Sequence, residues 1–154
     1  MSTQMVEKGV GTLAPGDGLV VCYFSVTLDH QSLGEWTDVE LGGVSVAVEQ
    51  VEEGGNQGFA YQLPGRLQFQ PIKLTRVMDS STSQVAEWFS GMTGAIKRST
   101  GQIVAYNTLS KPVLSWSFIE AIPVRWTLPT LSAKDASSAA TESLEIAHQG
   151  FVKV

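Results

Sequence analysis

Apolar and polar residues alternate along much of the chain, and the longest alternating stretch runs from Val113 to Trp126. Alternate positions of an extended backbone lie on one face, so the stretch predicts a strand with an apolar face that only Glu120 interrupts. At a rise of about 3.3 Å per residue it would span roughly 45 Å, more than twice a common strand length. We therefore expect it to bend or to serve two sheets. We place the break at Ala121-Ile122-Pro123, because proline cannot donate to a ladder. The apolar face comprises Leu114, Trp116, Phe118, Ile122, Val124 and Trp126.

Shorter alternating stretches predict further strands. From Leu19 to Asp29 the even-numbered residues are apolar, which predicts a strand with one buried face and a buried Cys22. Between Leu67 and Arg76 the apolar residues change from odd to even positions at a proline, which predicts a bulge. The remaining expected segments are a turn over residues 30–34, short strands over 35–37, 44–48 and 101–106, and a last strand over 142–151 with Leu144 and Ile146 on one face.

Turn signals separate these strands, and one segment has helical spacing. The dipeptide Pro64-Gly65 predicts a tight turn. Ser81 followed by Gln84 fits a capping box at a helix start, and Gly91 and Gly94 are expected to end that helix. An apolar stripe recurs at intervals of three and four residues on one side of the helix. It consists of Val85, Trp88, Phe89, Met92 and Ile96.

One helix among about seven strands predicts a mainly β fold, an antiparallel two-sheet β-barrel or sandwich with one flanking α-helix. Residues 1–18 show no period and contain several glycines, so we expect a flexible N-terminal arm followed by a single domain over residues 19–154. Residues 127–141 are small and polar and are expected to form a surface connector.

Composition limits the classes of partner. The net charge is -5 and the ten basic residues are scattered, which argues against sequence-specific binding of nucleic acid. No apolar run is long enough to span a bilayer, and the first residues lack the pattern of a signal peptide. We expect no membrane segment, and synthesis in the cytoplasm. Charged residues are only 16% of the chain, below the usual quarter, which predicts more covered surface than a monomer has.

The sequence contains no convincing catalytic, metal or cofactor site. Its only histidines, His30 and His148, lack a nucleophile elbow nearby, and one cysteine with two distant histidines does not make a zinc site. Glu52 and Glu53 would point to opposite faces of a strand, so they cannot converge on a substrate. We therefore expect no enzyme and no cofactor. Long apolar rows, few charges and no site favour self-association.

A second class of function is a monomeric β-sandwich binding module. Trp36 lies in polar surroundings and would be free to stack on a carbohydrate ring. Such a module would lose its ligand in a Trp36→Ala variant, whereas a structural subunit has no ligand to lose. A hydrolase that uses His148 is a third hypothesis, and it predicts an activity that His148→Ala abolishes.

Six short motifs follow one another along the chain: Glu53-Gly54-Gly55, Leu63-Pro64-Gly65-Arg66, Lys73-Leu74-Thr75-Arg76, Trp88 in the helix, Ile122-Pro123-Val124-Arg125-Trp126, and Glu142 through His148-Gln149-Gly150-Phe151. This ordered set resembles the tail tube proteins of contractile phages and of phage-tail-like contractile injection systems. The resemblance runs from about Leu19 to Phe151 and departs from the family in the arm before it and in the first hairpin, Asp29 to Trp36. Each motif is common alone, and their order at these separations carries the resemblance.

The resemblance implies a structural subunit whose hexameric rings stack around a wide lumen into an inner tube. It further implies a two-sheet β-barrel with a flanking helix, and a contractile sheath, baseplate and cap proteins as partners. The lumen leaves room for cargo. The particle would be a phage tail or a phage-tail-like particle, and the tube proteins of type VI secretion, which share this fold, are a close alternative.

By the same resemblance, the loop from Glu52 to Gly58 would touch neighbouring subunits. We expect both of its first glycines to need backbone angles that other residues avoid. Glu120 is expected to face the lumen or a neighbour, with Arg66, Arg76 or Arg125 as its ionic partner. The candidate interface residues are Glu52, Glu53, Gly54, Gly55, Asn56, Arg66, Arg76, Glu120 and Arg125.

Overall fold

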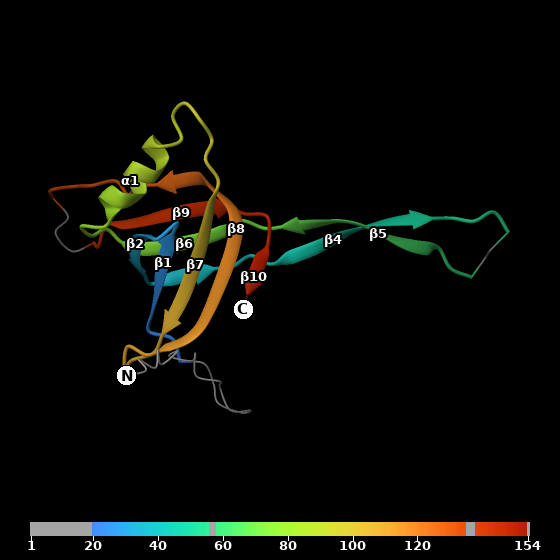
Figure 1. Ribbon diagram of the computed structural model, residues 1–154, viewed down its shortest axis with the longest axis horizontal. Coiled ribbons are helices and arrows are strands. Elements are labelled where there is room, and N and C mark those ends of the chain that lie inside the picture. The colour runs from blue at the N-terminus through green and yellow to red at the C-terminus, as the bar shows by residue number, and fades with distance from the viewer. Residues whose placement is uncertain (1–19, 56–57, 135–137, 154) are drawn as a thin grey trace, which may run out of the picture.

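The computed structural model describes residues 20–55, 58–134 and 138–153, and this part of the chain is mainly β with one helix (Figure 1). An antiparallel sheet has the strand order β2-β1-β7-β8-β9-β6-β3, with β10 beside β8, and β4 and β5 form a separate ribbon. The predicted class, two sheets with a flanking helix, is confirmed, although the main sheet does not close. The elements are β1 (Tyr23–Leu28), β2 (Gln31–Trp36), β3 (Asp38–Glu40), β4 (Val44–Val51), β5 (Tyr61–Phe69), β6 (Ile72–Val77), α1 (Thr82–Ser90), β7 (Ser99–Tyr106), β8 (Pro112–Thr127), β9 (Thr141–Ala147) and β10 (Phe151–Lys153).

The long strand β8 connects the two halves of the main sheet, as expected from its length. Its first half pairs with β7 and its last residues pair with β9, while β10 pairs with it near the middle. The bend begins at Glu120, where φ is 56°, rather than at the predicted Ala121-Ile122-Pro123. Two β8 residues between Phe118 and Ala121 lie opposite one residue of β7, which is a β-bulge. Pro123 still pairs, with Ile146 of β9.

The bulge in β8 changes which residues face the core. Phe118 and Ala121 are both fully buried although they are three positions apart. Val124, expected in the apolar row, is 51% exposed, so that part of the prediction is wrong. The extra residue shifts the alternation by one position, so Val124 leaves the core face. A second register shift, between Pro123 and Arg125, returns Trp126 to that face, where it packs against the core as predicted.

The core lies between the two halves of the main sheet and under α1. It is built from alternate residues of β1, β6, β7 and β9, together with Leu33 and Trp36 of β2. Trp36 is 0% exposed, and the Arg76 guanidinium carbon lies 4.1 Å from the centre of its ring. The polar neighbours of Trp36 in the sequence therefore gave a wrong expectation about its surroundings. The fully buried side chain cannot stack on a carbohydrate.

The first hairpin turns more tightly than predicted. Asp29 and His30 have φ values of 44° and 69°, and they link Leu28 directly to Gln31, its partner in the ladder. Two consecutive residues with positive φ make the two-residue turn whose twist suits a hairpin. The predicted turn over residues 30–34 is therefore wrong, since β2 already begins at Gln31. Cys22, which precedes β1, is exposed rather than buried.

The helix α1 is shorter than its apolar stripe suggests. Val85 is buried, and Trp88 and Phe89 pack against the core, but Ile96 lies beyond the helix and is 75% exposed. The Ser81 side chain makes no cap hydrogen bond, so the predicted capping box is not formed. Instead Oδ1 of Asp79 accepts a hydrogen bond of 2.7 Å from the Ser81 backbone N–H. In the described ranges no helix combines the length and the hydropathy needed to cross a bilayer.

Candidate functional site

The ribbon of β4 and β5 extends away from the rest of the molecule (Figure 1). Every residue of β4 is exposed, and so is every residue of β5 except Phe69. A two-stranded ribbon is marginally stable by itself in water, and contiguous exposed apolar side chains mark interaction sites. The ribbon is therefore the strongest candidate for a contact surface. Its exposed large apolar residues, with those next to it in the loop, are Val44, Val46, Val48, Val51, Phe59, Tyr61, Leu63 and Leu67.

A histidine anchors the base of this ribbon to the body. His148 Nε2 lies 3.2 Å from the Gln70 carbonyl oxygen, and its Nδ1 accepts a 3.2 Å hydrogen bond from the Gly150 N–H. Nδ1 can accept only if the proton is on Nε2, which then donates to Gln70. Burial lowers the pKa of His148 and thus favours this neutral imidazole. The ring also lies 4.7–6.0 Å, centre to centre, from the rings of Phe69, Phe118 and Phe151.

Pro64 and Gly65 lie inside β5, so the tight turn predicted for this dipeptide is wrong. The ladder passes from the pair Val46–Leu67 to the pair Val48–Pro64, so that two β5 residues lie opposite Ala47. This is a β-bulge, and such irregularities accommodate residues that a regular ladder excludes. A Cβ on Gly65 would lie 2.9 Å from the Ala47 carbonyl oxygen, which explains why glycine is suited to this position.

The tip of the ribbon carries the acidic residues singled out in the sequence. Glu52, Glu53, Gly54 and Gly55 are all exposed there. Gly55 has a φ of 104°, in the region that favours glycine, but Gly54 has no positive φ. The expected need for glycine therefore applies to one of the two positions. Asn56 lies outside the described residues, and so does the arm expected over residues 1–18.

Glu120 lies at the bend of β8, but its ionic partner is not one of the predicted arginines. Its Oε2 lies 3.6 Å from Nε of Arg98, and both side chains are about half exposed. Arg66 is exposed on β5, and Arg125 is exposed on β8 opposite Glu145 of β9. Arg98 was missed because it follows α1 in a segment with no periodic pattern, and only the folded sheet brings it to the bend.

Arg76 lies inside the subunit rather than on its surface. Its side chain is 2% exposed, and Nε lies 2.6 Å from Oε1 of Glu142, which is fully buried. Nη1 of Arg76 donates to the Leu33 carbonyl oxygen at 2.8 Å. Glu142 also accepts from Oγ1 of Thr82 at 2.9 Å and from Nε1 of Trp126 at 2.8 Å. These contacts join β6, β9, α1 and β8, so we remove Arg76 from the candidate contact surface.

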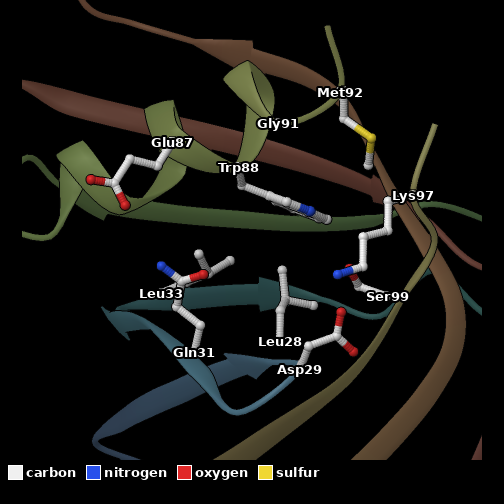
Figure 2. A pocket seen from close by; sticks show the side chains of 10 residues that line it. All are labelled: Leu28, Asp29, Gln31, Leu33, Glu87, Trp88, Gly91, Met92, Lys97 and Ser99. Carbon is white, nitrogen blue, oxygen red and sulfur yellow. The ribbon is translucent and has the colours of Figure 1, made fainter. Parts of the chain in front are cut away.

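A groove of about 300 Å³ lies between α1 and the first hairpin (Figure 2). Figure 2 shows Trp88 of α1 above Leu28 and Leu33, with Asp29 and Lys97 at one end of the groove. The Thr100 N–H donates to Asp29 at 3.0 Å, and this bond is the main cause that lowers the pKa of the Asp29 carboxyl. The Asp29 carboxylate therefore joins the hairpin turn to β7. Across the described ranges, no group of three or more His, Cys, Asp or Glu side chains could hold a metal ion.

A comparison with protein families identifies the family of the chain. The model of the T4-like virus tail tube protein gp19 family matches residues 20–152. The chain belongs to this tail tube family. The matched range contains the whole ribbon, the bend of β8 and the buried pair of β6 and β9, so the tail tube assignment covers every part of the candidate site. No curated protein sequence matches the chain.

Solved structures with the same fold agree with the tail tube assignment. A chain of the sheath–tube complex of the extracellular contractile injection system PVC, in its extended state, is 17% identical, with a TM-score of 0.71 over 99% of this chain and 100% of that one. A chain of the tube-terminating cap of the anti-feeding prophage is 16% identical, with a TM-score of 0.72 over 96% and 99%. Hcp1 from Flavobacterium johnsoniae is 18% identical, with a TM-score of 0.50 over 86% and 96%.

Proposed function

We propose that this tail tube protein is the non-catalytic subunit of an inner tube, built from hexameric rings that stack around a lumen, and that the β4–β5 ribbon makes its main contact with neighbours. The observation that carries the proposal is the exposure of the ribbon, whose apolar residues have no cover within the described subunit. A chain in the tail tube family has copies of itself to supply that cover.

The geometry of a stacked ring suits such a subunit. A ring with closed symmetry uses two different patches per subunit, and stacking of rings uses two more. A small chain can thus bury far more surface than a monomer would. The ends of the main sheet, β2 and β3, have no further strand beside them in the described subunit, and pairing across subunits would protect such edges from aggregation.

Several of the predicted interface residues are exposed, which supports the proposal that they contact a neighbour. Glu52, Glu53, Gly54 and Gly55 are exposed at the tip of the ribbon, and we propose that the tip touches a neighbour within or between rings. We further propose contacts for three charged residues that are exposed elsewhere on the surface, and we keep Asn56 as part of the tip contact. These three are Arg66, Glu120 and Arg125.

The partners follow from the assemblies in which similar chains were found. Those structures include a sheath–tube complex, a baseplate and a tube-terminating cap. We propose that the tube formed by this chain contacts a sheath protein and baseplate or cap proteins, and that its lumen can hold cargo. We also propose that the chain is made in the cytoplasm and assembled there into a phage tail or a phage-tail-like particle.

Sedimentation velocity of the purified protein tests this proposal. We expect species much larger than the monomer, whose share grows with protein concentration. A single monomeric species across a wide range of protein and salt concentrations would contradict it. The alternative, a carbohydrate-binding module, is opposed by the burial of Trp36. A Trp36→Ala variant should lose stability because it empties the core, and no ligand-binding effect is expected.

A further inference from the structure

The apolar residues of the ribbon form two patches on opposite local faces of its two halves. Alternation along β4 places Val44, Val46 and Val48 on one face and Val51 on the other. Directly opposed residues of an antiparallel pair share a face. Leu67 therefore joins the first group because it lies opposite Val46. We call Val44, Val46 and Leu67 the proximal patch; Val48 is on the same face of β4 but pairs with Pro64 on the tip side of the bulge.

The second patch lies nearer the tip. Tyr61 pairs with Val51, and Leu63 pairs with Glu49, which alternates with Val51 on the same face. The Phe59 ring packs edge-on against Tyr61, with 5.2 Å between ring centres. We call Val51, Tyr61 and Leu63 the distal patch. Each half of the ribbon thus has its apolar pairs on one face, with the charged Glu49 beside Leu63 in the distal half. The pairs behind the two patches are polar: Ser45 with Gln68 behind the proximal patch, and Gln50 with Gln62 behind the distal patch.

The bulge at Gly65 causes this change of face in β5, and in β4 the spacing of the valines follows it. Tyr61, Leu63, Leu67 and Phe69 occupy alternate positions of β5, so a regular ladder would place all four on one face. The bulge inserts one residue, and a shift of one residue sends every side chain beyond it to the opposite face. The sequence therefore has a single apolar row in β5, which the backbone divides in two.

The ribbon also turns over at its middle. In Figure 1, β5 lies above β4 near the body, the two strands cross, and β4 lies above β5 near the tip. A right-handed twist produces such a crossing, and a bulge increases the local twist. The crossing turns the distal half of the ribbon over, and the bulge moves the apolar side chains of β5 to the other face of that half. These two changes offset each other. Together they keep the proximal and distal patches toward the same side of the ribbon in space.

We propose that this continuous apolar side is a docking strip that lies along one neighbouring copy of the chain, and that Gly65 determines it by permitting the bulge. The inference rests on the proposed function, which supplies the neighbouring copies. The eight residues of β4 span roughly 26 Å, enough for one edge of a standard interface of about 800 Å² per partner. The opposite side, with Ser45, Gln50, Gln62 and Gln68, stays in contact with water.

Matched substitutions test whether the two patches act as one surface. Leu67→Gln changes the proximal patch and Leu63→Gln makes the same change in the distal patch, while Gln68→Thr and Gln62→Thr alter the polar side beside each of them. We expect each leucine variant to raise the protein concentration needed for assembly by about tenfold or more, because burying a leucine contributes 1.5–3 kcal/mol and about 1.4 kcal/mol is tenfold. Gln68→Thr and Gln62→Thr should assemble like the wild type.

Gly65→Ala provides a second, independent test. Its new methyl group should disturb the bulge and misdirect the distal patch, so assembly should fall about as far as in Leu63→Gln. Thermal unfolding of the monomer should not change in any of these variants, since all the altered residues lie in the ribbon, outside the buried core. The inference is overturned if only one leucine matters, or if the polar-side variants impair assembly equally. If the wild type itself stays monomeric, the proposed function fails first.

Discussion

The Nε atom of Arg76 lies 2.6 Å from Oε1 of Glu142, and both side chains are buried inside the subunit. Strands β6 and β9 pair Arg76 directly with Glu142, and the same carboxylate accepts hydrogen bonds from α1 and β8. A buried ion pair of this kind contributes little over an apolar substitute, but removing one partner leaves an uncompensated charge. The pair therefore holds the position of α1 on the sheet and is sensitive to single changes.

Replacing Glu142 with Gln should lower the free energy of unfolding by about 3 kcal/mol. The amide has one acceptor oxygen, so it cannot accept from Thr82 at the Oε1 position and from Trp126 at the Oε2 position at once. It also leaves the Arg76 charge with only Asp79, whose nearest oxygen lies 3.8 Å away on a side chain that is about half exposed. Urea unfolding at a concentration where the chain is monomeric measures the loss. Glu145→Gln, on the same strand, is the matched control and should cost less than about 1 kcal/mol.

The double variant Arg76→Met/Glu142→Gln separates the charge from the packing. Without the guanidinium no unpaired charge remains, so the double variant should lose less stability than the two single variants together. Additive losses would show that the ion pair does not couple β6 to β9.

The stability of the monomer should fall in mild acid because of His148. Burial lowers its pKa in the folded chain, so the unfolded chain binds this proton more readily. The stabilisation by neutral His148 is therefore complete above a pH of about 6.5 and is lost as the pH falls through the lowered pKa. The slope cannot exceed about 1.4 kcal/mol per pH unit.

Urea unfolding of the wild type and His148→Phe between about pH 5 and about pH 8 measures this effect. Phenylalanine keeps an aromatic ring among Phe69, Phe118 and Phe151 but has no proton to gain. The variant should lose the part of the pH dependence that lies below about pH 6.5. Identical pH profiles would show that His148 does not contribute to it.

Replacement by alanine should destabilise the subunit at Gly101 but not at Gly54. A Cβ on Gly101 would overlap Cζ of Phe118 and would lie 2.8 Å from Cδ2 of Leu28, in the core. Gly101→Ala should therefore destabilise the subunit by about 1–3 kcal/mol through overpacking. Gly54→Ala, where a Cβ meets nothing within 4 Å, should leave the thermal midpoint unchanged. Equal midpoints for both variants would contradict the packing around Phe118.

The tip of the ribbon should affect assembly rather than folding. Gly55 has a φ of 104°, which a β-branched residue avoids, so Gly55→Val should change the path of the loop and weaken assembly. Gly54→Val is the neighbouring control and should weaken it less. Light scattering against protein concentration compares the two variants. Normal assembly of Gly55→Val would mean that the tip only connects β4 to β5.

The sequence predicted most of the strands, because alternation reports which residues share a face. It expected a bulge within one strand between Leu67 and Arg76, but β5 ends and β6 begins there, and the two belong to different sheets. It predicted that the stretch from Val113 to Trp126 would serve two sheets, and β8 does so. It placed the bend at proline, whereas the bulge is at Glu120, since a polar residue can also adopt a positive φ. The pair of Arg76 and Glu142 could have been found by the same alternation, which puts each on the buried face of its strand.

The candidate site was harder to predict for a physical reason. An apolar row shows that a face is covered, but it does not show whether the subunit or a neighbour covers it. Val46 and Leu67 have the pattern of core residues, and both are exposed in the single chain. Trp36 has polar neighbours in the sequence and is fully buried. Only the folded chain separates the residues of the core from those of the ribbon.

Electron microscopy of the purified wild-type protein tests the central claim most directly. The account predicts six-fold rings with an open centre, alone or stacked into tubes of constant width. Particles of single subunits with no ring or tube, over the range of protein and salt concentrations in which the chain stays folded, would contradict it.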